Sequence, residues 1–247
     1  MLEKKCMIDV KNVSMRFNLA QEKTDTIKEY FVKLLKGKLL FNEFYALNDV
    51  SFTVNQGEAV ALIGRNGSGK STMLKNIAGV MRPTKGSVQV NGTVAPMIEL
   101  GAGFDLDLTA RENIFLNGAV LGYDRKFMRQ HFDSIVEFAE LQEFVDVPVK
   151  NFSSGMIARL GFAIATEVKA DILIVDEVLA VGDYAFQQKC MMRMNELLSG
   201  NTTLLFVSHD ISNVRKLCRR AIWIDGGRVV MDGDSNTVCD AYQPYNQ

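Results

Sequence analysis

The chain has 247 residues, 47% of them hydrophobic and 23% charged, which is typical of a soluble globular protein with room for one large domain. Its formal net charge of −1 provides no overall basic field, so the composition gives no support to a nucleic-acid partner. Four scattered cysteines without a CxxC pair favour reduced thiols in a cytosolic protein over a zinc site, and no apolar run approaches the roughly 18 residues of a membrane-spanning helix.

Apolar spacing predicts an alternation of strands and helices along the chain. The first elements are a strand in "MIDVKNVSMRF", two strands joined by "NQGE" in "LNDVSFTVNQGEAVALIG", a helix over 71–80, and two short strands around the Asn-Gly turn of "SVQVNGTVAPMIEL". There follow helices over 110–144 with a break at "LGYD", a helix in "SSGMIARLGFAIATEVK", the buried strand "ADILIVDE", a helix over 184–198, the strand "TTLLFVSHD" and a closing hairpin in "AIWIDGGRVVMDGD". This order predicts an α/β fold with a mostly parallel sheet covered on both faces, to which the strands at both ends add an antiparallel β layer.

Residues 18–45 fit this plan poorly and are predicted to be an insertion. Its apolar residues lie on one helical stripe, interleaved with lysines; they are Ile27, Tyr30, Phe31, Leu34 and Leu35, with Lys28, Lys33, Lys36 and Lys38. Two interpretations stay open. The segment is either a surface helix that buries its stripe on the domain or a docking element for a membrane partner or lipid headgroups.

The sequence "GRNGSGKS", residues 64–71, matches the P-loop pattern G-x-x-x-x-G-K-[ST] between a predicted strand and a predicted helix. Such a loop binds triphosphate because glycines let backbone N–H groups converge on the anion, and the following helix adds its own free N–H groups. Lys70 is predicted to contact the β- and γ-phosphates, and Ser71 to ligate Mg²⁺. The predicted nucleotide-binding residues here are Gly64, Arg65, Asn66, Gly67, Ser68, Gly69, Lys70, Ser71 and Thr72.

Two carboxylates and a histidine follow the later buried strands. Asp176 ends the strand in "ILIVDE" and is predicted to hold Mg²⁺, mostly through water. Glu177 is one residue further, so its side chain is expected to point in another direction, which makes it a candidate general base for an attacking water. His209 ends the strand in "LLFVSHD" and is predicted to contact the γ-phosphate and to orient Glu177. The other histidine, His131, lies in a polar helical stretch, and we predict no role for it.

A second glycine turn, in "NFSSGMIARLGFA", places Ser153, Ser154 and Gly155 ahead of a helix but has no lysine of its own. In combination with the P-loop and "ILIVDE" it resembles the signature turn, usually LSGGQ, of the ATP-binding cassette ATPases. In that family the signature of one subunit closes over the γ-phosphate on the P-loop of another. The resemblance therefore implies a homodimer in which the partner supplies the lysine. "VLAVGD" takes the place of the family's D-loop, with Asp183 matching its aspartate, and His209 matches the switch histidine.

The resemblance covers residues 8–234, with departures at three places. The signature carries Ser154 for the first glycine and Met156 for glutamine. Val178 replaces the usual proline after the catalytic glutamate. Glu99 stands where most cassettes have a Mg²⁺-sensing glutamine, so it is predicted as a further residue on the metal side that changes the local charge.

The combination "SSGM", "DEVLAVGD" and "ELGAGF" is similar to one subgroup, the ATPases of bacterial polysaccharide and polyol-phosphate exporters, which serve O-antigen, capsule and teichoic-acid export. This implies a single cassette domain over 1–247, with a helical signature subdomain at about 96–168. Some members of the subgroup carry an extra C-terminal carbohydrate-binding domain, and we expect none in this sequence, which ends at Gln247. The similarity also implies a peripheral subunit at the cytoplasmic face of the inner membrane. A separate polytopic permease would handle the polysaccharide cargo and lie near the insertion.

In the family, adenine normally stacks on an aromatic residue near the end of the first strand. Phe17 matches by its place in "VSMRF". Tyr45 is the alternative, because the insertion returns the chain there, and we favour it slightly. An aromatic residue at either place also has a plain role in packing.

The predicted function is ATP- and Mg²⁺-dependent hydrolysis that powers export of a polysaccharide or lipid-linked glycan. The segment Glu99–Phe104 and the insertion are predicted to transmit closure of the ATPase dimer to the permease. The leading alternative is a soluble, non-transport cassette ATPase acting on ribosomes or DNA. Such proteins usually carry two cassettes or long coiled coils, and this sequence shows one cassette and no heptads. A regulator without activity is disfavoured because Lys70, Asp176, Glu177 and His209 are all present.

Overall fold

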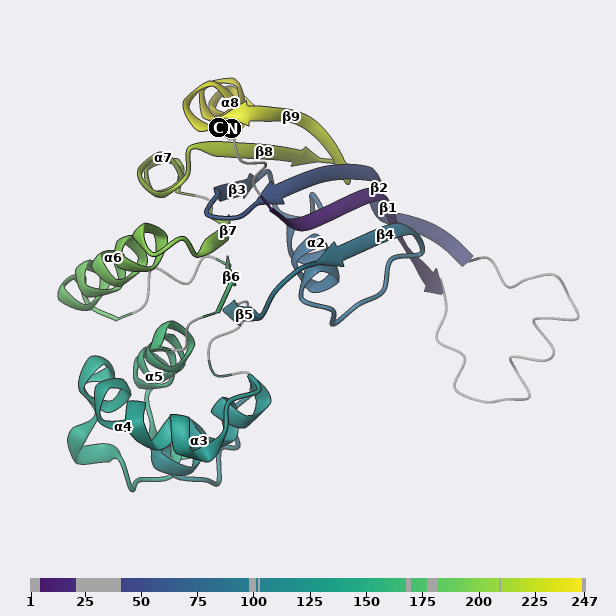
Figure 1. Cartoon of the computed structure of the whole chain (residues 1–247). Coiled ribbons are helices and arrows are strands. Elements are labelled where there is room, and N and C mark those ends of the chain that lie inside the picture. The colour runs from purple at the N-terminus through teal and green to yellow at the C-terminus, as the bar shows by residue number, and fades with distance from the viewer. Residues whose placement is uncertain are drawn as a thin grey trace, which may run out of the picture.

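A computed structural model describes the residues 5–20, 41–97, 101, 103–167, 170–176, 182–208 and 210–245. The strands are β1 (Cys6–Ala20), β2 (Phe41–Asn55), β3 (Ala59–Ile63), β4 (Lys85–Val90), β5 (Val94–Met97), β6 (Ile172–Asp176), β7 (Thr203–Val207), β8 (Arg220–Asp225) and β9 (Arg228–Asp234). The helices are α2 (Lys70–Ile77), α3 (Ala110–Val120), α4 (Arg125–Ala139), α5 (Ser154–Glu167), α6 (Tyr184–Ser199), α7 (Ile211–Leu217) and α8 (Ser235–Tyr242), with short 3₁₀ turns at Gln142–Phe144, Val149–Asn151 and Gln243–Tyr245. Figure 1 shows their arrangement.

The central sheet has the strand order β5-β6-β7-β3-β8-β9. Neighbouring strands from β5 to β8 are parallel, and β9 joins the edge as the antiparallel partner of β8. The mostly parallel sheet predicted from the sequence is therefore confirmed. Because parallel strands end at the same edge, β3, β6 and β7 have their carboxyl ends together there, which is where ligands bind in such sheets.

Both faces of this sheet are buried, in two separate apolar clusters. Val60 and Leu62 of β3 pack into one cluster with β1, β2 and α2, whereas Ala61 and Ile63 pack into the other with the remaining helices. Successive side chains of a strand point to opposite faces, so a strand covered on both sides must be apolar throughout. This explains why the sequence shows unbroken apolar runs at the central strands.

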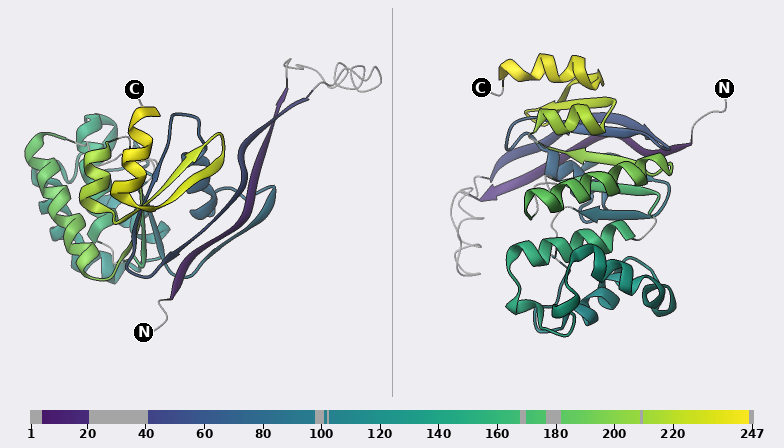
Figure 2. Two further views of the ribbon diagram at one scale, coloured as in Figure 1. Left: turned by 90° about the horizontal axis from the view of Figure 1, so that it is seen from above. Right: turned by 90° about the vertical axis from the view of Figure 1, so that its left-hand side faces the viewer.

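A second, antiparallel sheet has the order β2-β1-β4. It lies beside the central sheet with α2 between the two, as Figure 2 shows from above. β4 and β5, the two strands predicted around the Asn-Gly turn, do not pair with each other: β4 pairs with β1 and β5 with β6. The chain crosses between the two sheets here, and Asp171 accepts hydrogen bonds from the N–H and hydroxyl of Thr93 at the crossing, both at 2.8 Å.

The boundaries of the insertion differ from the predicted 18–45. β1 continues to Ala20 and β2 already begins at Phe41, and these two residues are partners in the antiparallel ribbon. Arg16 and Glu43 form an ion pair across the ribbon, with 2.6 Å between Nη1 and Oε1. The ribbon leads away from the body of the domain in Figure 2. The predicted apolar and lysine stripe falls within 21–40, outside the described residues.

Helices α3, α4 and α5 form a group at the end of the molecule beyond β5 (Figure 1). They occupy most of the segment predicted as a helical subdomain, and the break predicted at "LGYD" separates α3 from α4. The sequence analysis missed α7 and α8, which are 7 and 8 residues long. Within the described ranges no helix is long and apolar enough to cross a membrane.

Candidate active site

The P-loop connects the buried end of β3 to the start of α2, and close packing requires glycine at two of its positions, Gly64 and Gly69. Gly64 has a φ of 149° and Gly69 a φ of 109°, backbone conformations that residues with a side chain rarely adopt. A methyl group on Gly64 would collide with the carbonyl oxygen of Ile224, and one on Gly69 with that of Ala46. The loop is thus held between β8 and β2.

Lys70 opens α2, and only 6% of it is exposed. Its Nζ donates to the carbonyl oxygens of Gly64 at 2.7 Å and Arg65 at 2.9 Å. These bonds keep a cation at the N-terminus of a helix, where the free N–H groups already favour an anion. The loop is also fixed from outside, because the N–H of Gly227 donates to the carbonyl oxygen of Ser68 at 3.0 Å.

A cavity of about 240 Å³ opens above this loop. It is lined by Phe17, Phe44, Ala46, Asn66, Gly67, Gly69, Lys70, Ser71, Thr72 and Asp176. The structure therefore brings Asp176, at the end of β6, to the residues of the P-loop that lie more than a hundred positions earlier in the chain. It does so because β6 and β3 lie on either side of β7 in the sheet.

The donor set fits a magnesium ion bound together with a triphosphate. The cavity offers the Ser71 hydroxyl and the Asp176 carboxylate, and the described part of the chain contains no cluster of three or more His, Cys, Asp and Glu. Mg²⁺ keeps several waters and takes one or two protein oxygens plus phosphate oxygens in such sites. Two protein ligands therefore suit this ion, and a site built wholly from protein ligands is absent among these residues.

The aromatic side chains at the cavity are Phe17 and Phe44, whereas Tyr45 is not among the lining residues. Phe17 and Phe44 are cross-strand partners in the ribbon, and Tyr45 is opposite Arg16. Since side chains alternate along a strand, Phe44 and Ala46 share the cavity face and Tyr45 takes the other. Sequence reasoning missed Phe44, because its register depends on bulges in the pairing of β1 and β2.

Arg65, predicted among the nucleotide-binding residues, points to the C-terminal segment. Its Nε donates to the carbonyl oxygen of Tyr245 at 2.7 Å, and its Nη2 donates to the same oxygen. The ring of Tyr245 lies 5.1 Å from that of Trp223, centroid to centroid. The outer side of the P-loop is thus tied to residues about 180 positions further along the chain, a contact that no local sequence pattern predicts.

Three predicted residues lie outside the described part: Glu99, Glu177 and His209. The strands that precede the last two are nevertheless neighbours. Asp176 is the partner of Val207 in the pairing of β6 with β7.

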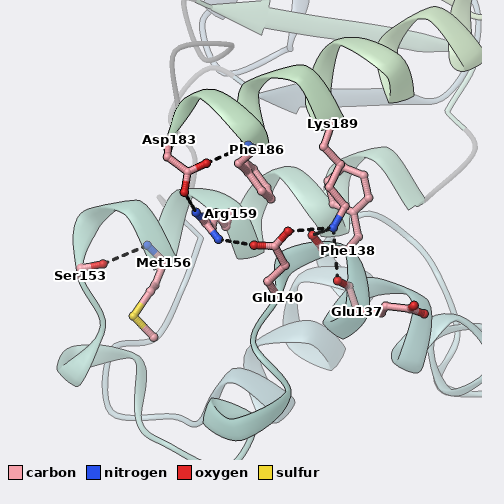
Figure 3. A network of polar contacts seen from close by, with 9 residues as sticks. All are labelled: Glu137, Phe138, Glu140, Ser153, Met156, Arg159, Asp183, Phe186 and Lys189. Atoms are coloured by element: carbon pink, nitrogen blue, oxygen red, sulfur yellow. Dashed lines mark hydrogen bonds and ion pairs between the residues drawn. The ribbon is translucent and has the colours of Figure 1, made fainter.

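The second glycine turn forms the N-terminus of α5. The Oγ of Ser153 accepts a hydrogen bond from the N–H of Met156 at 3.2 Å, which caps the helix (Figure 3). Ser153 and Ser154 are exposed, and Gly155 is half-buried. None of the three lines the P-loop cavity of the same chain. The turn therefore presents a capped helix N-terminus, a site suited to anions, at the surface.

The sequence matches the family described as ABC transporter over residues 47–180, more than half of the chain. The chain belongs to the ABC transporter family. The predicted enzyme class is confirmed by this match, so the protein is a nucleotide-binding ATPase.

Two exporter subunits resemble this ABC ATPase closely. It is 52% identical over 211 residues to the O-antigen export system ATP-binding protein RfbB of Klebsiella pneumoniae, covering 85% of this chain and 84% of that protein. It is 40% identical over 238 residues to the teichoic acids export ATP-binding protein TagH of Staphylococcus haemolyticus, covering 96% of this chain and 88% of that protein.

Among solved structures, the dimeric post-hydrolysis state of the ATP-binding cassette MJ0796 bound to ADP and Pi is similar with a TM-score of 0.75. The match covers 93% of this chain and 99% of the MJ0796 chain, at 24% sequence identity. The predicted ATP-binding cassette fold is confirmed.

Proposed function

We propose that this ABC ATPase powers export of a polysaccharide or lipid-linked glycan, of O-antigen, capsular or teichoic-acid type, across the bacterial inner membrane. The observation that carries the proposal is the cavity at the P-loop that unites Lys70, Ser71 and Asp176. The similarity of this chain to export subunits for O-antigen and teichoic acids supports the cargo class. Acting on ribosomes or DNA remains the alternative, and the names of these relatives favour export.

The proposed active form is a homodimer that binds two ATP molecules at the interface. Each site would combine the P-loop cavity of one chain with the turn Ser153–Gly155 of its partner. The position of that turn outside the cavity of its own chain supports this division, as does the dimeric assembly of the similar cassette. The γ-phosphate would favour the closed dimer because only the closed dimer contacts it from both sides.

Within each site the residues have distinct proposed roles. Lys70 and the N–H groups of the loop hold the phosphates, while Ser71 and Asp176 would hold Mg²⁺, which would supply neutralisation of phosphate charge. Glu177 accepts the proton of the attacking water, and His209 orients it. Glu99 is proposed to act on the metal side. Positioning and electrostatics supply most of the acceleration of phosphoryl transfer, so these groups must be held accurately.

The aromatic partner of adenine is proposed to be Phe17 or Phe44 rather than Tyr45, because both phenylalanines line the cavity. Phe44 is 47% exposed, so its ring has a face available for stacking. Tyr45 lies on the other face of the ribbon and is 38% exposed, so we propose no contact with adenine for it.

The permease is proposed to contact an apolar groove of about 430 Å³ between β5, α3 and α5. This groove is lined by part of the segment that is predicted to transmit dimer closure, namely Gly101, Gly103 and Phe104. Val80 and Val120 also line it and are 70% and 74% exposed, an unusual exposure for valine side chains. The protein would thus be peripheral, at the cytoplasmic face of the membrane.

The function is tested in the cell that makes this protein by replacing its chromosomal copy with Lys70→Ala. We expect surface glycan to disappear while glycan accumulates inside, and we expect the wild-type chain to copurify with a polytopic membrane protein. Lys150→Ala, which removes an exposed lysine that pairs with Asp107, is the matched control and should leave export unchanged. Normal surface glycan in the Lys70→Ala strain, combined with loss of ATPase activity in the purified variant, would rule out export.

A further inference from the structure

A guanidinium group joins the signature helix to the start of α6. Arg159 lies on α5 beyond the turn Ser153–Gly155. Its Nη2 donates to Oδ2 of Asp183 at 2.8 Å, and its Nη1 donates to Oε2 of Glu140 at 2.6 Å. The guanidinium carbon also lies 4.6 Å from the ring centroid of Phe186. Figure 3 shows Arg159 between these groups.

This arrangement requires arginine. Two carboxylates on different segments are bound at once by separate N–H groups of one planar group, and an aromatic face covers it. The Arg159 side chain is only 19% exposed, although Asp183 and Glu140 are 65% and 48% exposed. A lysine at this position has one compact ammonium group, so it cannot hold both carboxylates in the same geometry.

Asp183 also caps the N-terminus of α6. Its Oδ1 accepts a hydrogen bond from the N–H of Phe186 at 2.9 Å. The bond from Phe186, followed by the charge of Arg159, lowers the pKa of Asp183. The carboxylate is therefore ionised at neutral pH and binds the start of α6 and the helix α5 together.

Glu140 extends the connection to α4. It ends that helix in a left-handed conformation with a φ of 59°. Its other oxygen, Oε1, is 3.2 Å from Nζ of Lys189, which also donates to the carbonyl oxygen of Phe138 at 2.9 Å. A lysine at the C-terminus of a helix is favourable for the helix dipole. The end of α4 thus gives Arg159 a fixed support.

We propose that Arg159 is a positioning residue that holds the signature turn and the D-loop aspartate of one protomer in a fixed relation, so that both meet the partner's nucleotide as one unit. The inference rests on the proposed homodimer and deepens it. The signature turn is open around Gly155: a methyl group built there has only the Ser153 hydroxyl within 4 Å, at 3.8 Å. Its position must therefore come from the helix behind it. Arg159 is a polar clamp in the first half of that helix, whereas Glu167 makes polar contacts at its far end.

The test uses the full chain carrying Glu177→Gln, which is expected to form a stable ATP-bound dimer. Dimer formation with Mg-ATP is measured by analytical ultracentrifugation for Arg159→Gln, Asp183→Asn and their combination. Asparagine still caps a helix, so Asp183→Asn removes mainly the charge. We expect each variant to weaken dimerisation by about 10-fold or more, and the double variant to be no worse than the worse single one, because both remove the same link.

Two measurements separate positioning from a general loss of stability. The affinity of the isolated chain for a fluorescent ATP analogue should stay unchanged, because the P-loop cavity contains neither residue. With Glu177 restored, kcat should fall about 10- to 100-fold while the KM for ATP changes little. Arg159→Lys, which keeps the charge and one carboxylate contact, should give an intermediate kcat.

Matched controls come from the same helical region. Arg111 binds Asp146 at 2.7 Å and covers the ring of Phe132 at 4.8 Å, so Arg111→Gln makes the same chemical change elsewhere. Asp124 caps α4, so Asp124→Asn matches Asp183→Asn. If Arg159→Gln dimerises and turns over like Arg111→Gln, the positioning role is wrong. If the Glu177→Gln parent itself stays monomeric with ATP, the proposed homodimer is wrong instead.

Discussion

The P-loop and the signature turn both offer a helix N-terminus to an anion, yet they are built in opposite ways. The P-loop is held by the core: Gly64 and Gly69 pack against neighbouring strands, and Lys70 is almost completely buried. The signature turn exposes Ser153 and Ser154 and depends on polar contacts further along α5. The comparison indicates that one half of the proposed shared site is fixed by the fold, whereas the other half is proposed to be positioned by a charged clamp. The predictions below test each half, beginning with the largest effect.

Loss of the Lys70 charge should have the largest effect. Lys70→Ala removes the cation from the phosphate side, so hydrolysis should fall by about 10²- to 10³-fold or more, in line with loss of a principal electrostatic contact. Nucleotide affinity should fall in parallel, since the lysine is expected to contact the phosphates of bound ATP before the reaction as well as in the transition state. Steady-state ATPase assays and titration with a fluorescent ATP analogue measure both. A variant with parental activity would exclude Lys70 from the site.

A methyl group in the P-loop should distort it through backbone collision. Gly69→Ala should cost more than about 2 kcal/mol of unfolding free energy, because left-handed strain is added to a clash with Ala46. Gly79→Ala is the matched control, with a φ of 74° and no atom within 4 Å of the added methyl, and should cost about 1–2 kcal/mol. Urea denaturation compares the two. Equal losses would show that packing against β2 contributes nothing to the loop.

Changes at Ser153 should separate stability from assembly. Ser153→Ala loses the cap of α5 and should cost about 1 kcal/mol of stability. Ser153→Asp keeps a capping oxygen, so its stability should stay near that of the parent, but its charge would repel the partner's γ-phosphate. We therefore expect Ser153→Asp to bind nucleotide normally and to fail in ATP-driven dimerisation. Unimpaired dimerisation of Ser153→Asp would remove the turn from the shared site.

The smallest effect is expected at the outer tie of the P-loop. Arg65→Ala removes the bonds to the Tyr245 carbonyl and should lower the unfolding free energy by about 0.5–1.5 kcal/mol. Nucleotide affinity should decrease slightly, because the loop loses an external support. Arg129→Ala, at an exposed position of α4, is the control for a surface arginine. Thermal unfolding and nucleotide titration compare the variants, and identical behaviour would mean that the tie has no influence on the loop.

The sequence predicted the central strands well, because a strand buried on both faces must be continuously apolar. It missed α7 and α8, which are too short for a periodic apolar pattern, although their capping residues Asp210 and Asp234 provide a local signal. It also placed the two strands of the Asn-Gly segment together, whereas β4 pairs with β1 and β5 with β6, in different sheets. Local signals identify elements, but long-range contacts decide their partners.

The same distinction applies to the site. The P-loop and Asp176 could be predicted because their chemistry is written in short motifs that follow strands. The cavity aromatic Phe44 could not, because strand bulges set its register. Arg159 meets Glu140 and Asp183 from positions 19 and 24 residues away, so only the packing of α4, α5 and α6 reveals the clamp.

The central claim is that two chains share each reaction centre, and the molar mass of the Glu177→Gln chain tests it most directly. Light scattering in Mg-ATP should give twice the mass of the monomer, and the same sample in ADP should give the monomer. A chain that carries both Glu177→Gln and Ser153→Asp should stay monomeric in Mg-ATP. A wild-type chain that hydrolyses ATP at its full rate while remaining monomeric at every concentration would contradict the account.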